Sequence, residues 1–253
     1  MMADRVRRKW CVAPRLNPRA RLRLFCFPYA GGSASIYHLW HKRLPSEIEI
    51  LPIQLPGRAD RIQEELFRRI PDLVPVVSRE LLPELGRPFA FFGHSLGAIL
   101  CFEVARQLRR SGKVLPKCLF VSGRRAPQIP DSDPPCYSKS DADFLTDIDE
   151  LKGTSPEVRN NAELMQLLLP VLRADFELVE TYEYVQEPPL ACPIVAFGGT
   201  DDEETSGGML QAWQGQTSNT FTLHALEGGH FFIHSREDDL LQLLYAELRA
   251  LRL

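Results

Sequence analysis

Short runs rich in hydrophobic residues recur along this chain, and polar or glycine-rich segments separate them. A run of about four to eight such residues is typical of a strand that is buried on both faces. Several runs end at a turn signal, as residues 22–27 do at Pro28 and residues 48–55 do at Pro56-Gly57. The predicted strands are residues 22–27, 48–55, 88–92, 118–121, 193–197 and 219–223.

Longer segments with hydrophobic residues at helical spacing lie between these runs. Residues 235–251 place leucines along one side of a final amphipathic helix, and Ser235 with Asp238 three residues later resembles a capping box. Strands that alternate with helices predict an α/β fold, with a mostly parallel central sheet and helices on both faces. The predicted helices are residues 33–44, 72–85, 96–110, 209–214 and 235–251.

The alternation breaks after the fourth predicted strand. Residues 124–135 are rich in Pro and Asp, and residues 140–187 have helical character without a convincing strand. Such an interruption is too long for an ordinary crossover, and long insertions are often lids or binding loops. We therefore expect one domain over residues 1–253, with a helical lid insertion at residues 125–188.

Composition limits the classes of function. The chain has 253 residues, of which 44% are hydrophobic and 25% charged, which is ordinary for one globular domain. Its formal net charge of −3 gives no overall attraction to nucleic acid or to an anionic membrane. No apolar run approaches the length of a membrane span. We therefore expect no nucleic-acid or membrane partner. We also expect the chain to be a cytoplasmic monomer.

Six cysteines are scattered along the chain, and no two of them have CxxC spacing. This pattern favours reduced, mostly buried thiols over disulfides or a zinc site, so we expect no metal and no other cofactor. Residues 1–23 are basic and have no hydrophobic core of a secretion signal. We expect them to form a solvated, partly disordered leader, with a docking arm for an acidic partner as the alternative.

A candidate nucleophile lies where the third predicted strand meets a helix. Gly93-His94-Ser95-Leu96-Gly97 has the form G-x-S-x-G, in which the serine occupies a strained turn and the small residues let strand and helix approach closely. The N–H of Leu96 would face a developing oxyanion. His94 is rejected as the base, because adjacent residues on a tight turn point apart. The alternative is a glycine-rich turn without chemistry.

The catalytic base must follow the nucleophile, because hydrolases with this turn carry their triad in the order Ser, acid, His. His224, His230 and His234 are the histidines after Ser95. His224 falls in the last predicted strand if that strand continues over residues 219–225, His234 directly precedes the last helix, and His230 lies in the loop between them. That loop can project a side chain over the carboxyl end of the sheet, so we predict His230 as the base.

The acid that orients the base should follow a strand between the serine and the histidine. The fifth predicted strand is followed by a run of acids, Asp201-Asp202-Glu203-Glu204. A carboxylate at this place can accept from the His230 ring and fix its tautomer. Because the acids are consecutive, the choice between the first two stays open; we predict Asp201, with Asp202 as the alternative.

A second oxyanion donor should come from the loop after the first strand, by analogy with the HGGG loop of lipases. Residues 28–32 form this loop. Pro28 has no N–H and is excluded, so the N–H of Tyr29 or Ala30 is the candidate partner for that of Leu96.

Several motifs, in the same order along the chain, resemble the type II thioesterases that accompany polyketide synthases and nonribosomal peptide synthetases. The resemblance covers about residues 20–250. It implies an α/β-hydrolase fold with a flexible helical lid, and hydrolysis of acyl groups from the phosphopantetheine arm of acyl or peptidyl carrier proteins, which clears stalled or misprimed chains. The run of acids departs from the family, in which one Asp often precedes Pro or a small residue. The motifs are residues 27–34 (FPYAGGSA), 54–58 (QLPGR), 93–98 (GHSLGA), 169–176 (LPVLRADF) and 228–232 (GGHFF).

The triad alone does not separate this interpretation from three others. A carboxylesterase or lipase would use the same residues. A cyclising, product-releasing thioesterase would use them too, although the absence of a carrier or synthetase domain in this sequence argues mildly against it. A hydrolase-like binding module would not need an intact set of Ser95, Asp201 and His230.

Overall fold

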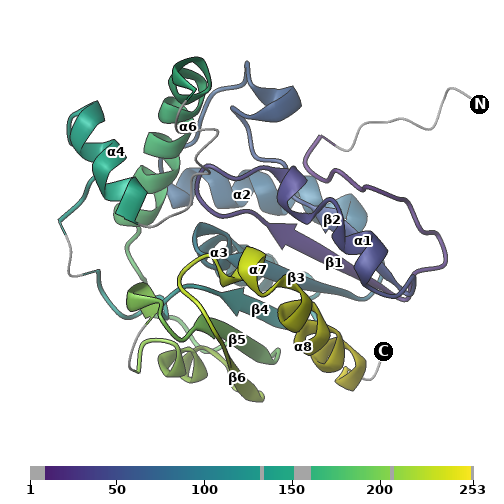
Figure 1. Cartoon of the computed structure of the whole chain (residues 1–253). Helices are drawn as coiled ribbons and strands as arrows, with labels where there is room; N and C mark the ends of the chain where they lie inside the picture. Colours follow the sequence, from purple (N-terminus) through teal and green to yellow (C-terminus); the bar gives the residue numbers. More distant parts are fainter. Residues whose placement is uncertain (1–8, 132–133, 151–160, 206–207, 252–253) are drawn as a thin grey trace, which may run out of the picture.

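The computed structural model describes residues 9–131, 134–150, 161–205 and 208–251. The strands are β1 (Leu22–Phe27), β2 (Ile48–Pro52), β3 (Phe89–His94), β4 (Leu119–Ser122), β5 (Ile194–Gly199) and β6 (Phe221–Leu226). They form one sheet in the order β2-β1-β3-β4-β5-β6, and every neighbouring pair is parallel (Figure 1). The predicted α/β class with a parallel sheet is therefore confirmed.

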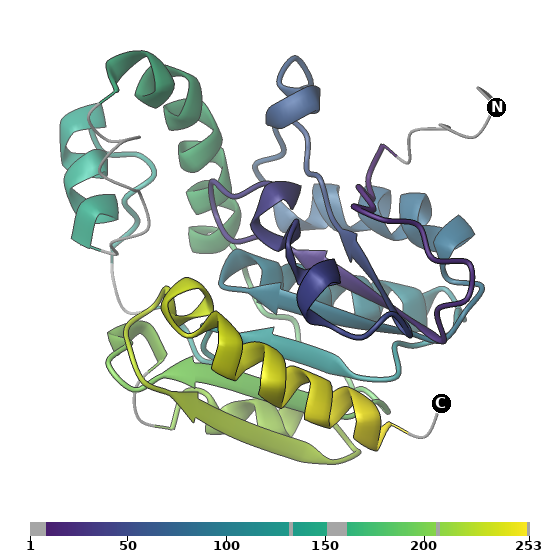
Figure 2. The same ribbon diagram turned by 45° about the vertical axis from the view of Figure 1, so that its right-hand side comes forward.

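Helices cover both faces of this sheet. They are α1 (Trp40–Arg43), α2 (Ile70–Leu81), α3 (Leu96–Arg110), α4 (Asp141–Glu150), α6 (Ala162–Glu180), α7 (Phe232–Ser235) and α8 (Glu237–Ala250). Helix α8 lies across one face, and α2 and α3 lie on the other (Figure 2). Phe91 of β3 packs in the core with α2 and α3, whereas its neighbour Phe92 packs in the core with α1 and α8. Burial on both faces explains why the strands are continuous hydrophobic runs.

The segment after β1 differs from its prediction as one helix over residues 33–44. It forms a 3₁₀ turn, η1 (Ala34–Tyr37), and the short helix α1. Tyr37 and Trp40 are both buried against the sheet, and the Tyr37 hydroxyl donates to Phe27 O at 2.7 Å. The helix is interrupted between these two residues, and both rings still pack on the same face of the sheet.

The last helix is shorter than predicted. Helix α8 begins at Glu237, after the separate turn α7, and its N-cap is Arg236 without a side-chain cap. The capping box predicted at Ser235 is therefore wrong, because Ser235 ends α7 instead. Residues 209–214, predicted as a helix, contribute to a 3₁₀ turn, η5 (Gln211–Gln216).

The basic leader is anchored at Trp10 and Cys11, whereas most of residues 12–21 are at least partly exposed, so its prediction as a solvated segment is corrected at these two residues. Trp10 and Cys11 are both buried, and Cys11 pairs with Ile53 in an antiparallel bridge beyond the end of β2. The Arg61 guanidinium lies 4.1 Å from the centre of the Trp10 ring. Aromatic burial and this cation–π contact hold the segment in place; residues 1–8 lie outside the described residues.

The described parts of residues 125–188 contain α4 and α6 and no strand. Both helices stand beyond the carboxyl ends of the central strands and lie side by side (Figures 1 and 2). Phe144 and Ile148 of α4 form a small buried cluster with Leu172 of α6 and with Cys136. The interruption of the β/α pattern is therefore a helical layer above the sheet.

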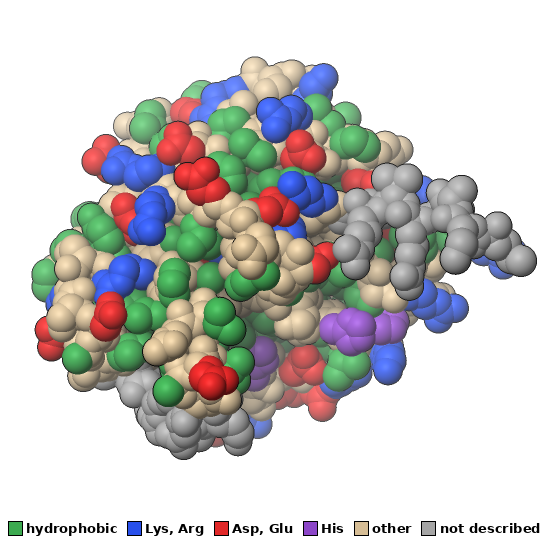
Figure 3. All heavy atoms as spheres, turned by 90° about the horizontal axis from the view of Figure 1, so that it is seen from above, with side chains coloured by type: hydrophobic (Ala, Val, Ile, Leu, Met, Phe, Trp, Pro, Cys, Tyr) green, Lys and Arg blue, Asp and Glu red, His purple; other side chains and the backbone are tan. Residues whose placement is uncertain are grey.

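All six cysteines are buried and none of them forms a disulfide, as expected for reduced thiols. In the ranges that the structure covers, no helix is both long and apolar enough to cross a membrane. Seen from above, Lys and Arg side chains are interspersed with Asp and Glu, and neither sign gathers into one large patch (Figure 3).

Candidate active site

Ser95 lies at the turn between β3 and α3. Its backbone has φ 53° and ψ −116°, a conformation that residues other than glycine rarely adopt. Ser95 N–H donates to Ser122 O at 2.8 Å, and Ala98 N–H donates to Ser95 O at 2.9 Å. The strained strand–turn–helix predicted from G-x-S-x-G is present, and Leu96 is the first residue of the helix that follows.

Close backbone contacts require glycine on both sides of this turn. A Cβ atom on Gly93 would lie 2.1 Å from Gly97 O, and a Cβ atom on Gly97 would lie 2.2 Å from Phe27 O. The first contact lets β3 and α3 approach each other. The second brings α3 against the end of β1, where the loop with the candidate oxyanion donors begins.

His94 is fully buried beneath the candidate site. Its Nδ1 lies 2.9 Å from Ser122 Oγ, and its ring centre is 5.2 Å from that of His230. Burial lowers the pKa of the His94 imidazole well below its usual value, and the neighbouring His230 lowers it further. His94 is thus a neutral, packed residue that is hydrogen-bonded through its Nδ1.

His230 lies in the loop between β6 and α7, and its partner is Asp202. His230 Nδ1 is 3.0 Å from Asp202 Oδ2, and the Asp202 side chain is 1% exposed. Asp202 Oδ1 accepts the N–H of Glu204 at 3.2 Å. Both oxygens of this buried carboxylate are therefore used, one by the candidate base and one by the backbone.

The prediction of Asp201 as the partner of His230 is wrong. Asp201 N–H donates to Gly228 O at 2.9 Å, which extends the pairing of β5 with β6 past the ends of the strands. This bond leaves Asp201 exposed to solvent, and the next residue, Asp202, turns inward. Asp202, the alternative that the sequence left open, is the acid that the fold brings to His230.

The two other candidate histidines have different partners. His224 Nε2 lies 2.8 Å from Glu247 Oε1 of α8, at the surface of the sheet edge. His234 Nε2 lies 2.8 Å from the Tyr29 hydroxyl, and burial lowers the pKa of His234 below its usual value. Neither contact involves Ser95, which agrees with surface or packing roles.

The loop at residues 28–32 lies beside the Ser95 turn. Gly32 N–H donates to Tyr29 O at 2.9 Å, which closes the loop as a tight turn. In the described part of the chain, neither Tyr29 N–H nor Ala30 N–H donates to another protein group. Both donors are therefore available to an oxyanion.

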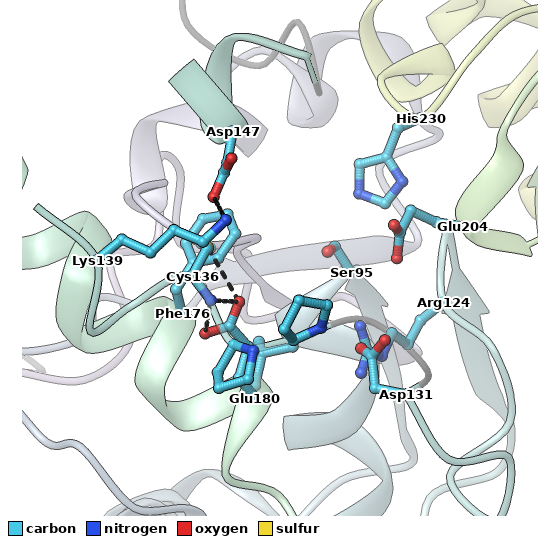
Figure 4. A pocket seen from close by; sticks show the side chains of 14 residues that line it. Ser95, Arg124, Asp131, Cys136, Lys139, Asp147, Phe176, Glu180, Glu204 and His230 are labelled. Carbon is cyan, nitrogen blue, oxygen red and sulfur yellow. Dashed lines mark hydrogen bonds and ion pairs between the residues drawn. The ribbon is translucent and has the colours of Figure 1, made fainter. Parts of the chain in front are cut away.

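Ser95 and His230 line one cavity with a volume of about 390 Å³. Ala30, one of the two residues that carry a candidate oxyanion donor, lines it as well. Figure 4 shows Phe176 and Glu180 of α6 on the wall formed by residues 125–188. Ser95, His230 and the helical layer thus line one cavity.

The wall formed by the helical layer is tied together by Glu180. Its carboxylate accepts the N–H groups of Cys136 at 3.0 Å and Tyr137 at 2.9 Å, and Lys139 Nζ pairs with Asp147 Oδ2 at 2.8 Å. These bonds connect the last turn of α6 to the segment that leads into α4. Among the described residues, no group of three or more His, Cys, Asp or Glu side chains could hold a metal ion.

Sequence reasoning missed a buried ion pair beside the site, between Arg58 and Asp175. Both residues belong to motifs that carried the family resemblance, but neither was given a role. The two positions are 117 residues apart, so no local spacing could have paired them.

The chain is similar to several known proteins. The family model described as "Thioesterase domain" matches residues 22–248. Gramicidin S biosynthesis protein GrsT of Aneurinibacillus migulanus is 42% identical over 241 residues, which are 95% of this chain and 94% of GrsT. RedJ, a thioesterase from the prodiginine pathway of Streptomyces coelicolor, has a TM-score of 0.87 and 38% identity, and the match covers 93% of this chain and 94% of RedJ. BorB, the type II thioesterase of the borrelidin cluster, has a TM-score of 0.87 and 35% identity over 95% of this chain and 98% of BorB.

Proposed function

Because this chain belongs to the thioesterase family, we propose that it hydrolyses acyl groups from the phosphopantetheine arm of acyl or peptidyl carrier proteins. In this role it clears stalled or misprimed chains during polyketide or nonribosomal peptide biosynthesis. One observation carries the proposal: His230 is paired with the buried carboxylate of Asp202 and opens onto the same cavity as Ser95. Relatives named for the gramicidin S, prodiginine and borrelidin pathways support the biosynthetic setting.

Ser95, His230 and Asp202 form the proposed triad. His230 keeps its Nδ1–H on Asp202 and accepts the Ser95 Oγ proton at Nε2 while the oxygen attacks the thioester carbonyl. The Asp202 carboxylate then stabilises the imidazolium, and its burial leaves this attraction poorly screened by water. Asp202 thus takes the role that the sequence assigned to Asp201.

Backbone donors hold the oxyanion of the tetrahedral intermediate in this proposal. Leu96 N–H, in the first turn of α3, is one donor, and the positive end of the helix dipole supports it. The second donor is the N–H of Ala30 or Tyr29. Since Ala30 lines the cavity, we favour Ala30.

Collapse of the intermediate breaks the C–S bond. The proton on His230 passes to the departing thiolate, and the acyl group remains as an ester on Ser95. His230 next takes a proton from water as the water oxygen attacks the ester, and returns it to Ser95 Oγ as the acid leaves. One thioester and one water become one thiol and one carboxylic acid, and the scheme uses no cofactor.

Residues 125–188 are the proposed lid of this single domain. Phe176 and Val179 of α6 line the cavity together with Ser95. A helical layer in this place can cover the acyl chain and limit the access of water. The bonds of Glu180 to the segment before α4 support movement of the two helices as one unit.

A carrier protein is the proposed partner, and we propose that the chain meets it as a monomer in the cytoplasm. Light scattering after size exclusion, with and without the loaded carrier, tests the oligomeric state. A stable dimer of the free chain would contradict this part of the proposal.

The main experiment measures release of free carrier thiol from a panel of acyl groups, loaded on a phosphopantetheinylated carrier protein. We expect turnover by the native chain and none by Ser95→Ala, with unchanged circular dichroism. A folded Ser95→Ala protein with full activity would contradict the whole mechanism.

The same panel separates the alternatives. Comparable or faster turnover of p-nitrophenyl esters would favour a carboxylesterase or lipase, and cyclised products would favour a product-releasing thioesterase. A fluorophosphonate probe should label Ser95, and failure to label would favour a binding module without catalysis.

A further inference from the structure

Three segments that are distant in the sequence meet at one buried ion pair beside the site. Arg58 follows β2, and Asp175 lies on α6; Nη1 of Arg58 is 2.7 Å from Oδ2 of Asp175, and Nη2 is 2.8 Å from Oδ1. Only 6% and 1% of the two side chains are exposed. Asp175 Oδ2 also accepts the N–H of Gly31 at 2.7 Å. The pair therefore connects α6 to the loop at residues 28–32.

Arg58 also binds the loop at residues 28–32, through a backbone carbonyl group. Its Nη1 donates to Gly32 O at 3.0 Å. Gln54 links the residues on either side of this hydrogen bond. Its Oε1 accepts the N–H of Ala34, shortly after the loop, at 3.1 Å, and its Nε2 donates to Arg58 O at 3.3 Å. One N–H and one carbonyl of the loop are thus each bound to one partner of the ion pair.

Helix α6 also contacts the loop directly. Gly31 has φ +74°, and a Cβ atom there would lie 2.4 Å from Leu172 Cδ2 of α6. Tyr29 and Ala30, which carry the candidate oxyanion donors, directly precede Gly31. The directions of their N–H bonds therefore depend on the conformation that α6 and Arg58 fix at Gly31 and Gly32.

We propose that Arg58 and Asp175 are positioning residues that aim the oxyanion donors of this loop, and that the oxyanion hole is complete only while α6 is seated on it. The inference rests on the proposed function, since it presumes acyl transfer through Ser95. Oxyanion holes act by being preorganised, and when α6 lifts away, Gly31 N–H loses its charged partner. Covering of the acyl chain and completion of the catalytic site are then one event.

The test is Asp175→Asn in the full chain. Both oxygens of Asp175 accept hydrogen bonds, so the amide NH₂ of Asn faces a donor whichever way it is turned. Misplacement of a catalytic group by about 1 Å costs about 100-fold in rate. We expect kcat for a carrier-bound acyl group to fall by about that factor, with KM changed by less than roughly threefold.

The affinity of a boronic acid that adds to Ser95 provides a second measurement. This affinity would not change if Arg58 and Asp175 only stabilised the fold. The tetrahedral boronate adduct places an oxygen in the oxyanion hole, so the affinity should fall by the same factor as kcat/KM. The rate of fluorophosphonate labelling should fall in parallel. Neither probe needs a carrier protein. A native chain that reacts with both probes but hydrolyses no carrier thioester would therefore contradict the proposed substrate. The two probes would still test the role of Arg58 and Asp175 in that case.

Glu177→Gln is the matched control. Glu177 lies on the same helix, and its Oε2 pairs with Arg68 Nη1 at 2.7 Å, where the Arg68 side chain is 51% exposed. This ion pair also ties α6 to the segment before α2 but does not involve the loop. We expect all three readouts to stay within about twofold of the native chain, since exposed ion pairs contribute little.

Asp175→Asn leaves the Arg58 charge buried without its partner, which can destabilise the fold. The double variant Arg58→Gln, Asp175→Asn removes both charges and serves as the second test if the single variant does not fold. Arg58→Lys keeps the positive charge but cannot bind both oxygens of Asp175 as the guanidinium does, so we expect an intermediate kcat. A folded single or double variant with native kcat and boronate affinity overturns the inference, and so does a loss confined to KM.

Discussion

Replacing Asp202 by Asn changes the charge beside His230 with almost no change in shape. Asp202 Oδ1 accepts Glu204 N–H, and Oδ2 faces His230 Nδ1. The Asn amide should keep its oxygen on Glu204 N–H, because the opposite orientation would place two donors against each other. Its NH₂ then donates to His230 Nδ1 and moves the ring proton to Nε2, the nitrogen that must accept the Ser95 proton.

The wrong tautomer removes the base while binding persists. In a Ser-His-Asp triad this exchange costs about 10⁴-fold in kcat, or about 5 kcal/mol of transition-state stabilisation. The Asp202 side chain is 1% exposed, so water cannot replace the lost charge. We expect KM to stay close to its native value, because neither Asp202 nor the Nδ1 side of His230 faces the cavity contents.

The matched variant is Asp201→Asn, at the exposed neighbouring position. Steady-state kcat and KM on one loaded carrier protein, together with thermal unfolding, give the comparison. We expect Asp201→Asn to lie within about twofold of the native chain, as is usual for exposed sites without a key contact. Loss of kcat in Asp201→Asn with native activity in Asp202→Asn would refute the reasoning.

Three further outcomes are expected. Gly97→Ala should lower the free energy of unfolding by about 1–3 kcal/mol, because its Cβ would lie 2.2 Å from Phe27 O; an unchanged urea midpoint would contradict this. Burial holds the pKa of His94 well below its value in the unfolded chain, so below about pH 6.5 the unfolded state binds a proton that the folded state does not. The free energy of unfolding should therefore decrease as the pH is lowered, by up to about 1.4 kcal/mol per pH unit. His94→Gln should flatten this slope in urea titrations at pH 5 to 7, and an equal slope would argue against it. Burial also raises the pKa of Cys26 and Cys101 well above the usual value, so mass spectrometry should find both unmodified after iodoacetamide treatment of the folded chain at about pH 8; rapid labelling without denaturant would show that they are accessible.

The central strands and the helix of the nucleophile turn could be predicted from the sequence alone. β1 and α3 have the bounds that the hydrophobic pattern predicts, since burial on both faces and an uninterrupted helical period leave few alternatives. The segment at residues 33–44 was harder, because the burial of Tyr37 and Trp40 depends on the sheet beneath them and not on local spacing.

The residues of the candidate site likewise fall into those whose place could be predicted from the sequence and those whose place could not. The places of Ser95 on a strained turn and of His230 in the loop after β6 could be predicted, because the turn motif and the loops at the strand ends leave few candidates. Asp201 and Asp202 are chemically identical neighbours, and the bond from Asp201 N–H to Gly228 O, a tertiary contact, decides between them. The pairing of Arg58 with Asp175 likewise depends on how α6 is laid over the sheet, which no periodicity in the sequence encodes.

The continued pairing of β5 with β6 has an evolutionary consequence. Thr200 N–H donates to Leu226 O at 2.8 Å, and Asp201 N–H donates to Gly228 O, so the residues that follow, Asp202 and His230, are carried by one rigid ladder. Residues 125–188 leave the sheet after the carboxyl end of β4 and return to it at the amino end of β5, so they interrupt no part of this ladder. Lineages can therefore change the parts of the helical layer that do not contact residues 28–32 or Arg58, while the pairing of β5 with β6 that carries Asp202 and His230 is inherited unchanged.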